Sequence, residues 1–259
     1  MNNLPDHTDG SRLAHFLIKP ALLLLLLATT GGLMPATVSA GDLLAGAAKV
    51  DITNRDVPLV NDPLYVKALV IKEGDTTAVI VTVDAVAIGE IGSITNEYLG
   101  NVRNQIEKDL QIKPKNIMVN AIHCHGIVCK DVEQRTVQAI KEAAKNLVPV
   151  NVGVGTGHED RVMENRRLFL KNGKEADVRH AYSLPPDEEV AGIGPIDPEI
   201  GILKLDKKNG ETLAVVYNFA CHPIQGVPGG GNTADITGYA SAVIEENFGN
   251  DAVALFLQG

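Results

Sequence analysis

The fold is decided by a unit that reads TAVIVTV at residues 77–83, ITNEYLGNVRNQIEKDL at 94–110 and IMVNAI at 117–122. The outer segments are short and rich in β-branched residues, which is typical of buried strands. In the middle segment apolar residues recur at every fourth position, which predicts a helix. Ser93 can cap its start, and Pro114 follows its end. Two strands joined by a helix are the repeating unit of an α/β fold.

Segments of both kinds continue on either side of this unit. The stretch 174–198 is charged, has no periodicity and is predicted to be a long surface loop. The alternation predicts a single α/β domain with a mixed sheet and flanking helices. The further elements are predicted strands at 45–52, 65–72, 150–154, 201–205, 213–219 and 252–257, and predicted helices at 131–146 and 238–247.

The first forty residues have the three parts of a secretory signal peptide. Arg12 and Lys19 precede an apolar run at 21–28, and Val38-Ser39-Ala40 supplies small residues for cleavage after Ala40. The apolar run is shorter than the ~20 residues that a membrane-spanning helix needs. We therefore expect residues 1–40 to be removed and residues 41–259 to be exported to the periplasm or the exterior.

The charge of the chain argues against nucleic acid as a partner. The formal net charge is -9, tryptophan is absent, and the sequence has no cluster of basic residues, so nucleic acid is a poor partner.

The cysteine content bears on disulfide bonds. Cys124, Cys129 and Cys221 are the three cysteines, and an odd number cannot all pair. A bond between Cys124 and Cys129 stays open, and at least one buried free thiol is expected.

Histidines stand where two predicted strands end. His123 and His125 follow the strand at 117–122, and His222 follows the strand at 213–219. Alternate side chains of a strand lie on one face, so His123 and His125 are expected to project together. Imidazole nitrogens are preferred ligands of zinc, and one interpretation is therefore a metal site at this edge of the sheet. The other is a set of histidines that are satisfied by hydrogen bonds.

A glycine-rich segment, GGGNTAD at 229–235, leads into the last predicted helix. Free backbone amides at a helix start can stabilise an anion. The segment is not a phosphate-binding loop, because no Gly-Lys-Ser/Thr ending follows it. The structural interpretation makes Asp235 the N-cap of the helix and the glycines a linker, and it leaves Thr233 unexplained.

Several short motifs occur in an order that resembles the N-terminal domain of the neutral, non-lysosomal ceramidases and their bacterial relatives. Together they span essentially the whole of residues 41–259. The motifs are AGAAKVDIT (45–53), VTVDA (81–85), NAIHCHG (120–126), NRR (165–167), NFACHP (218–223), DITGYA (235–240) and LFLQG (255–259).

The resemblance implies a zinc-dependent hydrolase of N-acyl amide bonds. It implies that His123 and His222 are ligands of Zn²⁺, and that His125 and Arg166 act on the reacting group beside the metal. Thr233 falls where the family has a serine, and it is the third implied catalytic residue. The glutamate and tyrosine that complete the family's metal site lie downstream of the last motif, so residues 41–259 are expected to form an incomplete catalytic domain. Asp84 matches an aspartate for which a structural or supporting role is expected.

The implied partner is an amide-containing small molecule or lipid, such as an N-acylsphingosine, together with transient contact with a membrane surface. Two alternatives stay open. A barrel-type amidohydrolase also uses an HxH pair at a strand end, but that pair belongs on the first strand, and here several strands precede it. The second alternative is a non-catalytic exported relative that binds metal or lipid, which the missing ligands favour.

Overall fold

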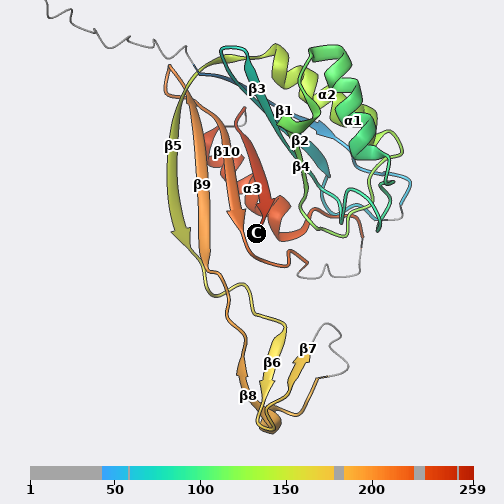
Figure 1. Cartoon of the computed structure of the whole chain (residues 1–259), viewed down its shortest axis with the longest axis vertical. Helices are drawn as coiled ribbons and strands as arrows, with labels where there is room; N and C mark the ends of the chain where they lie inside the picture. The colour runs from blue at the N-terminus through green and yellow to red at the C-terminus, as the bar shows by residue number, and fades with distance from the viewer. Residues whose placement is uncertain (1–42, 58, 178–183, 225–230, 250) are drawn as a thin grey trace, which may run out of the picture. The chain divides into compact units, whose positions relative to one another are not determined.

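The computed structural model describes residues 43–57, 59–177, 184–224, 231–249 and 251–259, and these residues fall in one compact unit. The predicted alternation of strands and helices is confirmed (Figure 1). The helices are α1 (Tyr98–Leu110), α2 (Val132–Lys145) and α3 (Asp235–Phe248). The strands of the larger sheet are β1 (Leu44–Asp51), β2 (Tyr65–Glu73), β3 (Thr76–Val83), β4 (Ile117–Ala121), β5 (Val148–His158), β9 (Glu199–Lys207), β10 (Thr212–Phe219) and β11 (Val253–Gln258).

The larger sheet is mixed, with the strand order β11-β10-β9-β5-β1-β2-β3-β4. The pairs β3–β4 and β10–β11 are parallel, and the other neighbouring strands are antiparallel. Each parallel pair is joined through a helix, α1 in the first case and α3 in the second. Two strand–helix–strand units therefore stand at the two ends of the strand order, which is the mixed α/β architecture expected from the sequence.

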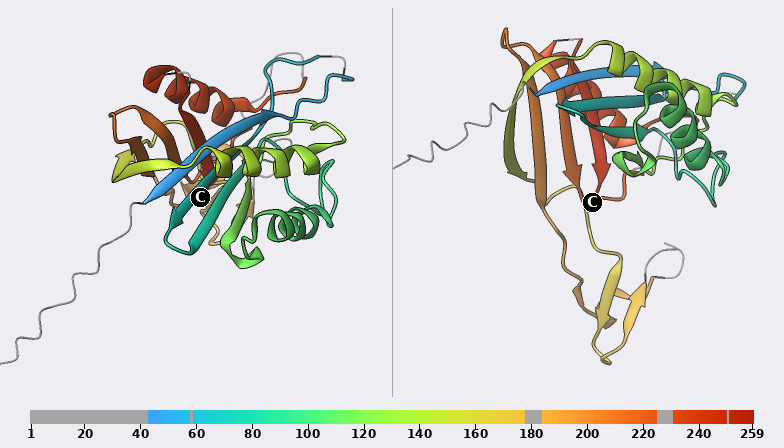
Figure 2. Two further views of the ribbon diagram at one scale, coloured as in Figure 1. Left: turned by 90° about the horizontal axis from the view of Figure 1, so that it is seen from above. Right: turned by 45° about the horizontal axis from the view of Figure 1, so that its top comes forward.

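Helices α1 and α2 lie side by side and pack on the β1–β3 part of the sheet (Figure 2). Ile106 of α1 and Ile140 of α2 are completely buried there. The hydroxyl groups of Tyr98 and Thr136 lie 2.8 Å apart and join the two helices. A Cβ atom on Gly46 would lie 2.0 Å from the carbonyl oxygen of Ala143, so glycine at this position lets α2 approach β1.

Strand β11 is tied to the opposite end of the strand order by side chains. Asn120 of β4 donates from Nδ2 to the carbonyl oxygen of Phe256, at 3.2 Å. Lys67 of β2 donates from Nζ to the carbonyl oxygen of Ala254, at 2.9 Å, and to Glu245 of α3, also at 2.9 Å. Lys67 and Glu245 are both buried. These contacts bring the carboxyl ends of β4 and β11 together, and the site is built at that edge.

The start of α1 differs from the sequence-based expectation. Helix α1 begins at Tyr98 with Glu97 as its N-cap, so the prediction of a start near Ile94 with Ser93 as the cap was wrong. Ile94 keeps the apolar periodicity because it packs into the core from the turn before the helix, where it is 4% exposed.

Within the described ranges, no helix is long and apolar enough to span a membrane.

The stretch 174–198 is not simply a loop. It contains β7 (Glu175–Asp177), a 3₁₀ turn at Asp187–Glu189 and β8 (Val190–Ile193), and both strands pair with β6 (Arg167–Leu170). Strands of three and four residues are too short to show a periodicity of two in the sequence. Residues 178–183 lie outside the described residues.

Candidate functional site

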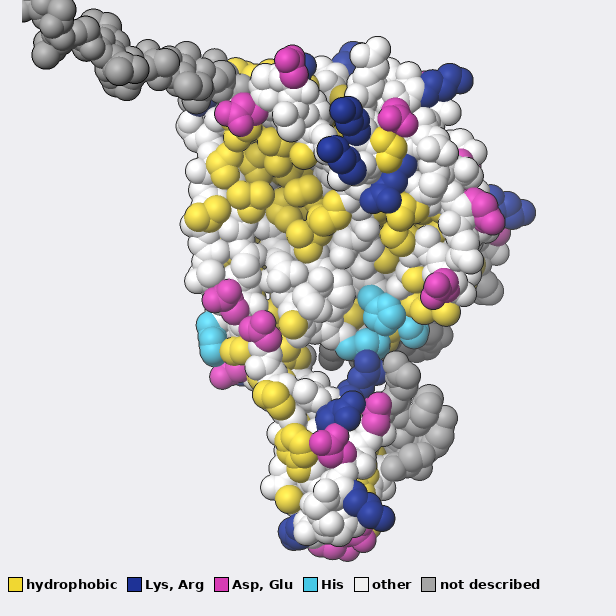
Figure 3. All heavy atoms as spheres, viewed as in Figure 1, with side chains coloured by type: hydrophobic (Ala, Val, Ile, Leu, Met, Phe, Trp, Pro, Cys, Tyr) yellow, Lys and Arg dark blue, Asp and Glu magenta, His cyan; other side chains and the backbone are white. Residues whose placement is uncertain are grey.

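A recess of about 600 Å³ opens where the carboxyl ends of β4, β10 and β11 meet. Segments 163–166 and 195–196, which flank the small sheet of β6, β7 and β8, form its opposite wall. Histidine side chains gather on the corresponding face of the molecule (Figure 3). Three of the residues singled out in the sequence, His123, Arg166 and His222, line this recess.

The backbone at His123 leaves the strand geometry at the end of β4. Its N–H donates to the carbonyl oxygen of Ala85, at 3.0 Å, and its φ is +67°, which is uncommon for a residue other than glycine. The ring nitrogen Nδ1 lies 2.8 Å from the carbonyl oxygen of Val86. Because a carbonyl oxygen only accepts, Nδ1 carries the proton of the neutral ring and Nε2 keeps its lone pair. Such a contact orients an imidazole for binding through Nε2.

The histidine rings lie close together. The ring centroids of His123 and His222 are 5.1 Å apart, and those of His123 and His125 are 6.3 Å apart. The pKa of His222 is lowered by partial burial, by the positive charge of Arg166 and by the neighbouring histidines. A lowered pKa keeps the imidazole of His222 neutral, which is the form that binds a metal ion.

The rings of His123 and His125 lie near each other, but the strand geometry from which this was expected does not reach them. Strand β4 ends at Ala121, so strand geometry does not extend to the two histidines. An alternation of burial continues past the strand, with Ile122 and Cys124 in the core and the histidines on the open side. His125 is exposed and is not among the residues that line the recess, and its ring centroid lies 6.3 Å from that of His123.

Thr233 is not among the residues that line the recess. Its side chain is buried, and its hydroxyl donates to the carboxylate of Asp62. The same oxygen accepts the N–H of Asp235, at 2.9 Å. These contacts fix the start of α3. Asp235 is the first residue of that helix and Ala234 its N-cap, so the expectation of Asp235 as the N-cap was wrong.

Asp84 has the structural role that was expected. Its carboxylate is buried and accepts the N–H of Tyr65, at 2.7 Å. Burial raises the pKa of Asp84 to about 6, and the nearby charge of Lys67 opposes that rise. The residue therefore supports the turn after β3, whose carbonyl groups orient His123.

Sequence reasoning missed the polar side chains that hold the site loops. Asn232 is buried, and its side chain bonds to both the N–H and the carbonyl of Ile127, at 2.6 and 2.8 Å, two residues after His125. Gln258 donates from Nε2 to the carbonyl oxygen of Cys221, at 2.8 Å, next to His222. Both residues lie in or beside the motifs, but no feature of the sequence says what their amides contact.

The metal-binding capacity of the described residues is limited. Within the described ranges, no group of three or more His, Cys, Asp or Glu side chains gathers as a metal site. A catalytic zinc has three protein ligands and one position open for water. The imidazoles of His123 and His222 could supply two of these three ligands. Cys124, Cys129 and Cys221 are free, as expected for at least one of them. Burial raises the pKa of Cys124 and of Cys221, which disfavours thiolate ligands.

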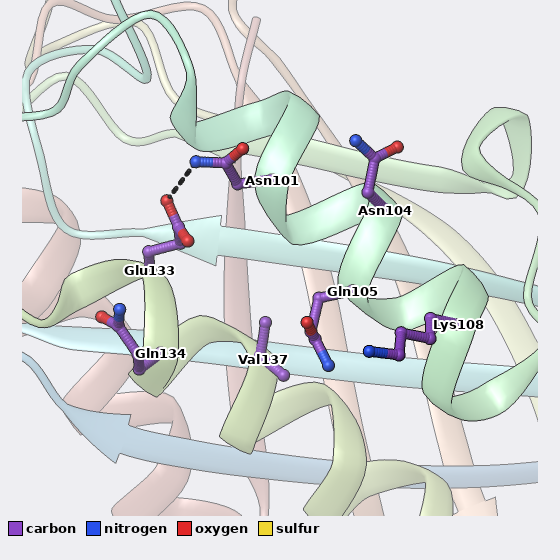
Figure 4. A pocket seen from close by; sticks show the side chains of 7 residues that line it. All are labelled: Asn101, Asn104, Gln105, Lys108, Glu133, Gln134 and Val137. Atoms are coloured by element: carbon purple, nitrogen blue, oxygen red, sulfur yellow. Dashed lines mark hydrogen bonds between the residues drawn. The ribbon is translucent and has the colours of Figure 1, made fainter.

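A second hollow, of about 500 Å³, lies between α1 and α2 (Figure 4). Its walls carry the carboxamides of Asn101, Asn104, Gln105 and Gln134, and Asn101 donates to Glu133 at 2.9 Å. Its lining contains Lys108 and Glu133 but no histidine, cysteine, serine or threonine. The recess at the strand ends is therefore the candidate active site.

Among known proteins, two solved ceramidase structures share this fold. No protein-family model matches the chain, and no curated protein matches it. A solved structure described as a ceramidase complexed with C2 matches with a TM-score of 0.64 and 20% identity, over 84% of this chain and 37% of that chain. The neutral ceramidase from Pseudomonas aeruginosa matches with a TM-score of 0.62 and 20% identity, over 84% of this chain and 38% of that one. The chain thus spans less than two fifths of these proteins, and across that part it has the ceramidase fold.

Proposed function

We propose that this chain is a ceramidase-like hydrolase of N-acyl amide bonds that uses Zn²⁺ as its cofactor. The observation that carries the proposal is the close pair of His123 and His222 in the recess. They stand at strand ends in a chain whose fold matches two ceramidase structures. The sequence motifs imply the same two histidines as ligands.

The residues of the recess suit the chemistry of amide cleavage. Zinc would be held by His123 and His222 with further ligands from elsewhere, and it would activate water and polarise the amide carbonyl. Arg166 and His125 would stabilise the negative charge that develops on the carbonyl oxygen. A preorganised donor of this kind lowers the barrier by about 3 to 4 kcal/mol. The catalytic role of Thr233 stays a prediction, because its hydroxyl bonds to Asp62 and Asp235.

The wall of the recess supports an amide with apolar substituents as the substrate. Met163 and Ile196 line it beside Arg166, and Ile196 is 37% exposed. Apolar side chains next to a cation can take an acyl chain and a polar head group together. We therefore propose an N-acylsphingosine or a similar lipid amide, reached by transient contact with a membrane surface.

Zinc binding tests the metal part of this proposal. His123→Asn and His222→Asn remove one imidazole each, and asparagine tolerates the positive φ at position 123. His158→Asn is the control, because His158 is exposed and pairs with Asp160 rather than with a residue of the recess. We expect equilibrium dialysis to show at least tenfold weaker zinc binding in both site variants and unchanged binding in the control. Equal binding in all four proteins would show that these histidines are not ligands.

Turnover tests the reaction itself. The zinc-loaded chain is assayed for release of fatty acid from N-acylsphingosines, with Arg166→Gln and His125→Asn as site variants. We expect both variants to reduce the rate by 10²-fold or more. A specific observation favours the alternative of a metal-binding relative without turnover: among the residues that the structure describes, His123 and His222 are close together and no group of three or more potential ligands gathers. Zinc binding that depends on His123 and His222, without amide hydrolysis, would establish that alternative.

We further propose that the protein is exported, from the signal-peptide features of residues 1–40, which lie outside the described residues. The N-terminus of the secreted protein is expected at Gly41. Recovery of the exported protein with Met1 still in place would contradict the cleavage site.

A further inference from the structure

We propose that Glu164 is a specificity residue of the recess, whose carboxylate binds the amine half of the ligand and holds the ammonium group of a released amine. The inference rests on the proposed function, since it concerns the same recess and the products of amide hydrolysis. Among the described residues that line the recess, Glu164 is the one acidic side chain, and it is exposed. A ligand in the recess can therefore reach it.

Asn165 fixes the segment that carries Glu164. Its Nδ2 donates to the carbonyl oxygen of Pro195, at 2.6 Å, and its Oδ1 accepts the N–H of Arg167, at 2.8 Å. Pro195 belongs to the other segment of the same wall of the recess. The amide of Asn165 thus ties the two segments together and sets the course of the backbone at Glu164.

The burial of side chains alternates along this segment. Met163 and Asn165 are half-buried, whereas Glu164 and Arg166 are exposed and line the recess. In an extended chain, side chains two residues apart lie on the same side, about 6.6 Å from each other along the chain. The wall therefore presents a carboxylate and a guanidinium to the same recess.

The two charges of this wall do not neutralise each other. Within the described ranges, no ion pair joins Glu164 to Arg166. The nearby Arg161, by contrast, bonds Glu159 at 2.6 Å, and neither of these two residues lines the recess. Glu164 and Arg166 are thus the charges of opposite sign that a ligand in the recess meets.

The products of amide hydrolysis carry the same two charges. The oxygen of water bonds to the acyl carbon, the C–N bond breaks and the nitrogen takes up a proton, which gives a carboxylic acid and an amine. Near neutral pH the acid then loses a proton and the amine gains one. The carboxylate product matches Arg166 and the ammonium product matches Glu164, since hydrogen bonds between charged groups are stronger than neutral ones.

A general attraction of cations to an acidic chain is the competing explanation. The formal net charge of the chain is -9, so some attraction of this kind is expected. At 0.15 M salt, exposed charges are screened beyond about 8 Å, and binding is therefore measured at that ionic strength. Glu107→Gln is the matched control, because Glu107 of α1 is exposed and lies outside the recess.

Binding to the zinc-free chain tests the inference without any need for turnover. The probes are n-octylamine, which is an ammonium ion at pH 7, and octan-1-ol, which has the same chain without the charge. The measurement is an NMR titration after dialysis against a chelator. We expect the wild type to bind octylammonium about fivefold more tightly than octanol. Glu164→Gln keeps the size of the side chain and should reduce this preference to within about twofold, whereas Glu107→Gln should leave it unchanged.

Arg166→Gln shows whether the sign of the charge matters. It removes the neighbouring cation and keeps Glu164, so the preference for octylammonium should persist. Four results would overturn the inference: equal binding of both probes by the wild type, a preference that survives in Glu164→Gln, an equal reduction in Glu107→Gln, or loss of the preference in Arg166→Gln. Each of these concerns binding alone, so failure of the proposed hydrolysis is seen separately.

Discussion

The imidazole rings of His123 and His222 lie 5.1 Å apart and 75° from parallel, although they follow strands from opposite ends of the strand order. His123 follows β4, which closes the first strand–helix–strand unit, and His222 follows β10, which opens the second. The two ends meet because β11, the neighbour of β10, contacts β4 through Asn120. The site is therefore a consequence of how the two units pack, and each unit supplies one imidazole.

The first prediction concerns the tautomer of His123. The carbonyl oxygen of Val86 lies 2.8 Å from Nδ1, so the neutral ring should carry its proton on Nδ1. Nitrogen-15 NMR above neutral pH is expected to show a protonated Nδ1 and a bare Nε2 for this residue. A neutral ring that is protonated on Nε2 would contradict the proposed use of that nitrogen as a ligand.

Asp84 should make stability depend on pH. Its pKa is raised from 3.8 to about 6 by burial, so the folded protein holds this proton more tightly than the unfolded chain. Stability from this group is present below pH ~4 and is lost as pH rises towards 6, by about 3 kcal/mol in total. Asp84→Asn can still accept the N–H of Tyr65 and should remove that loss.

Urea unfolding at pH 4 and at pH 7 checks this prediction. Relative to the wild type, Asp84→Asn should be more stable at pH 7 and about equal at pH 4. Asp56→Asn is the control, because Asp56 is exposed, and it should shift both values by less than about 0.5 kcal/mol. A gain for Asp84→Asn that is the same at both pH values would argue against titration of this carboxyl.

The buried ion pair between Lys67 and Glu245 should contribute far more to stability than an exposed pair. Lys67 is 4% exposed and bonds both Glu245 and the carbonyl oxygen of Ala254. Lys67→Met leaves a buried carboxylate with less compensation and should cost about 3 kcal/mol or more. Lys207 pairs with exposed Glu211, and Lys207→Met should cost less than about 1 kcal/mol. Similar losses for both variants, measured by urea unfolding at pH 7, would mean that the burial of the pair has little effect.

Periodicity in the sequence was enough to predict the first strand–helix–strand unit, because its segments are long and the apolar residues of its helix lie on one side. It misplaced the start of α1, since Ile94 packs in the core from a turn that has the same spacing as a helix. It missed the small sheet of β6, β7 and β8, whose pairing depends on contacts between distant short segments.

In the site, too, some features could be predicted from the sequence and others could not. Motif order was enough to select His123, His222 and Arg166, and the structure brings these side chains to one recess. The positive φ of His123 and the acceptor at Val86 could not be predicted, because both depend on the turn after β3. The contacts of Asn232 and Gln258 were also beyond prediction, since an amide fits many partners and only the packing of the units selects them.

The last prediction separates two roles for Thr233. The sequence places it where the family has a serine, which implies catalysis, whereas the structure gives its hydroxyl two partners at the start of α3. Thr233→Val keeps the shape of the side chain but removes both hydrogen bonds. We expect it to lower the free energy of unfolding by about 1 to 3 kcal/mol, and Thr233→Ser to restore most of that loss.

Thermal unfolding of the wild type and of both variants measures this effect, and zinc binding by each folded protein serves as the second readout. A structural hydroxyl predicts a lower melting temperature for Thr233→Val, with zinc affinity unchanged in the molecules that remain folded. If Thr233→Val instead melts like the wild type while amide hydrolysis falls, the hydroxyl acts in the reaction. The contacts with Asp62 and Asp235 would then be interactions that the fold can lose without cost.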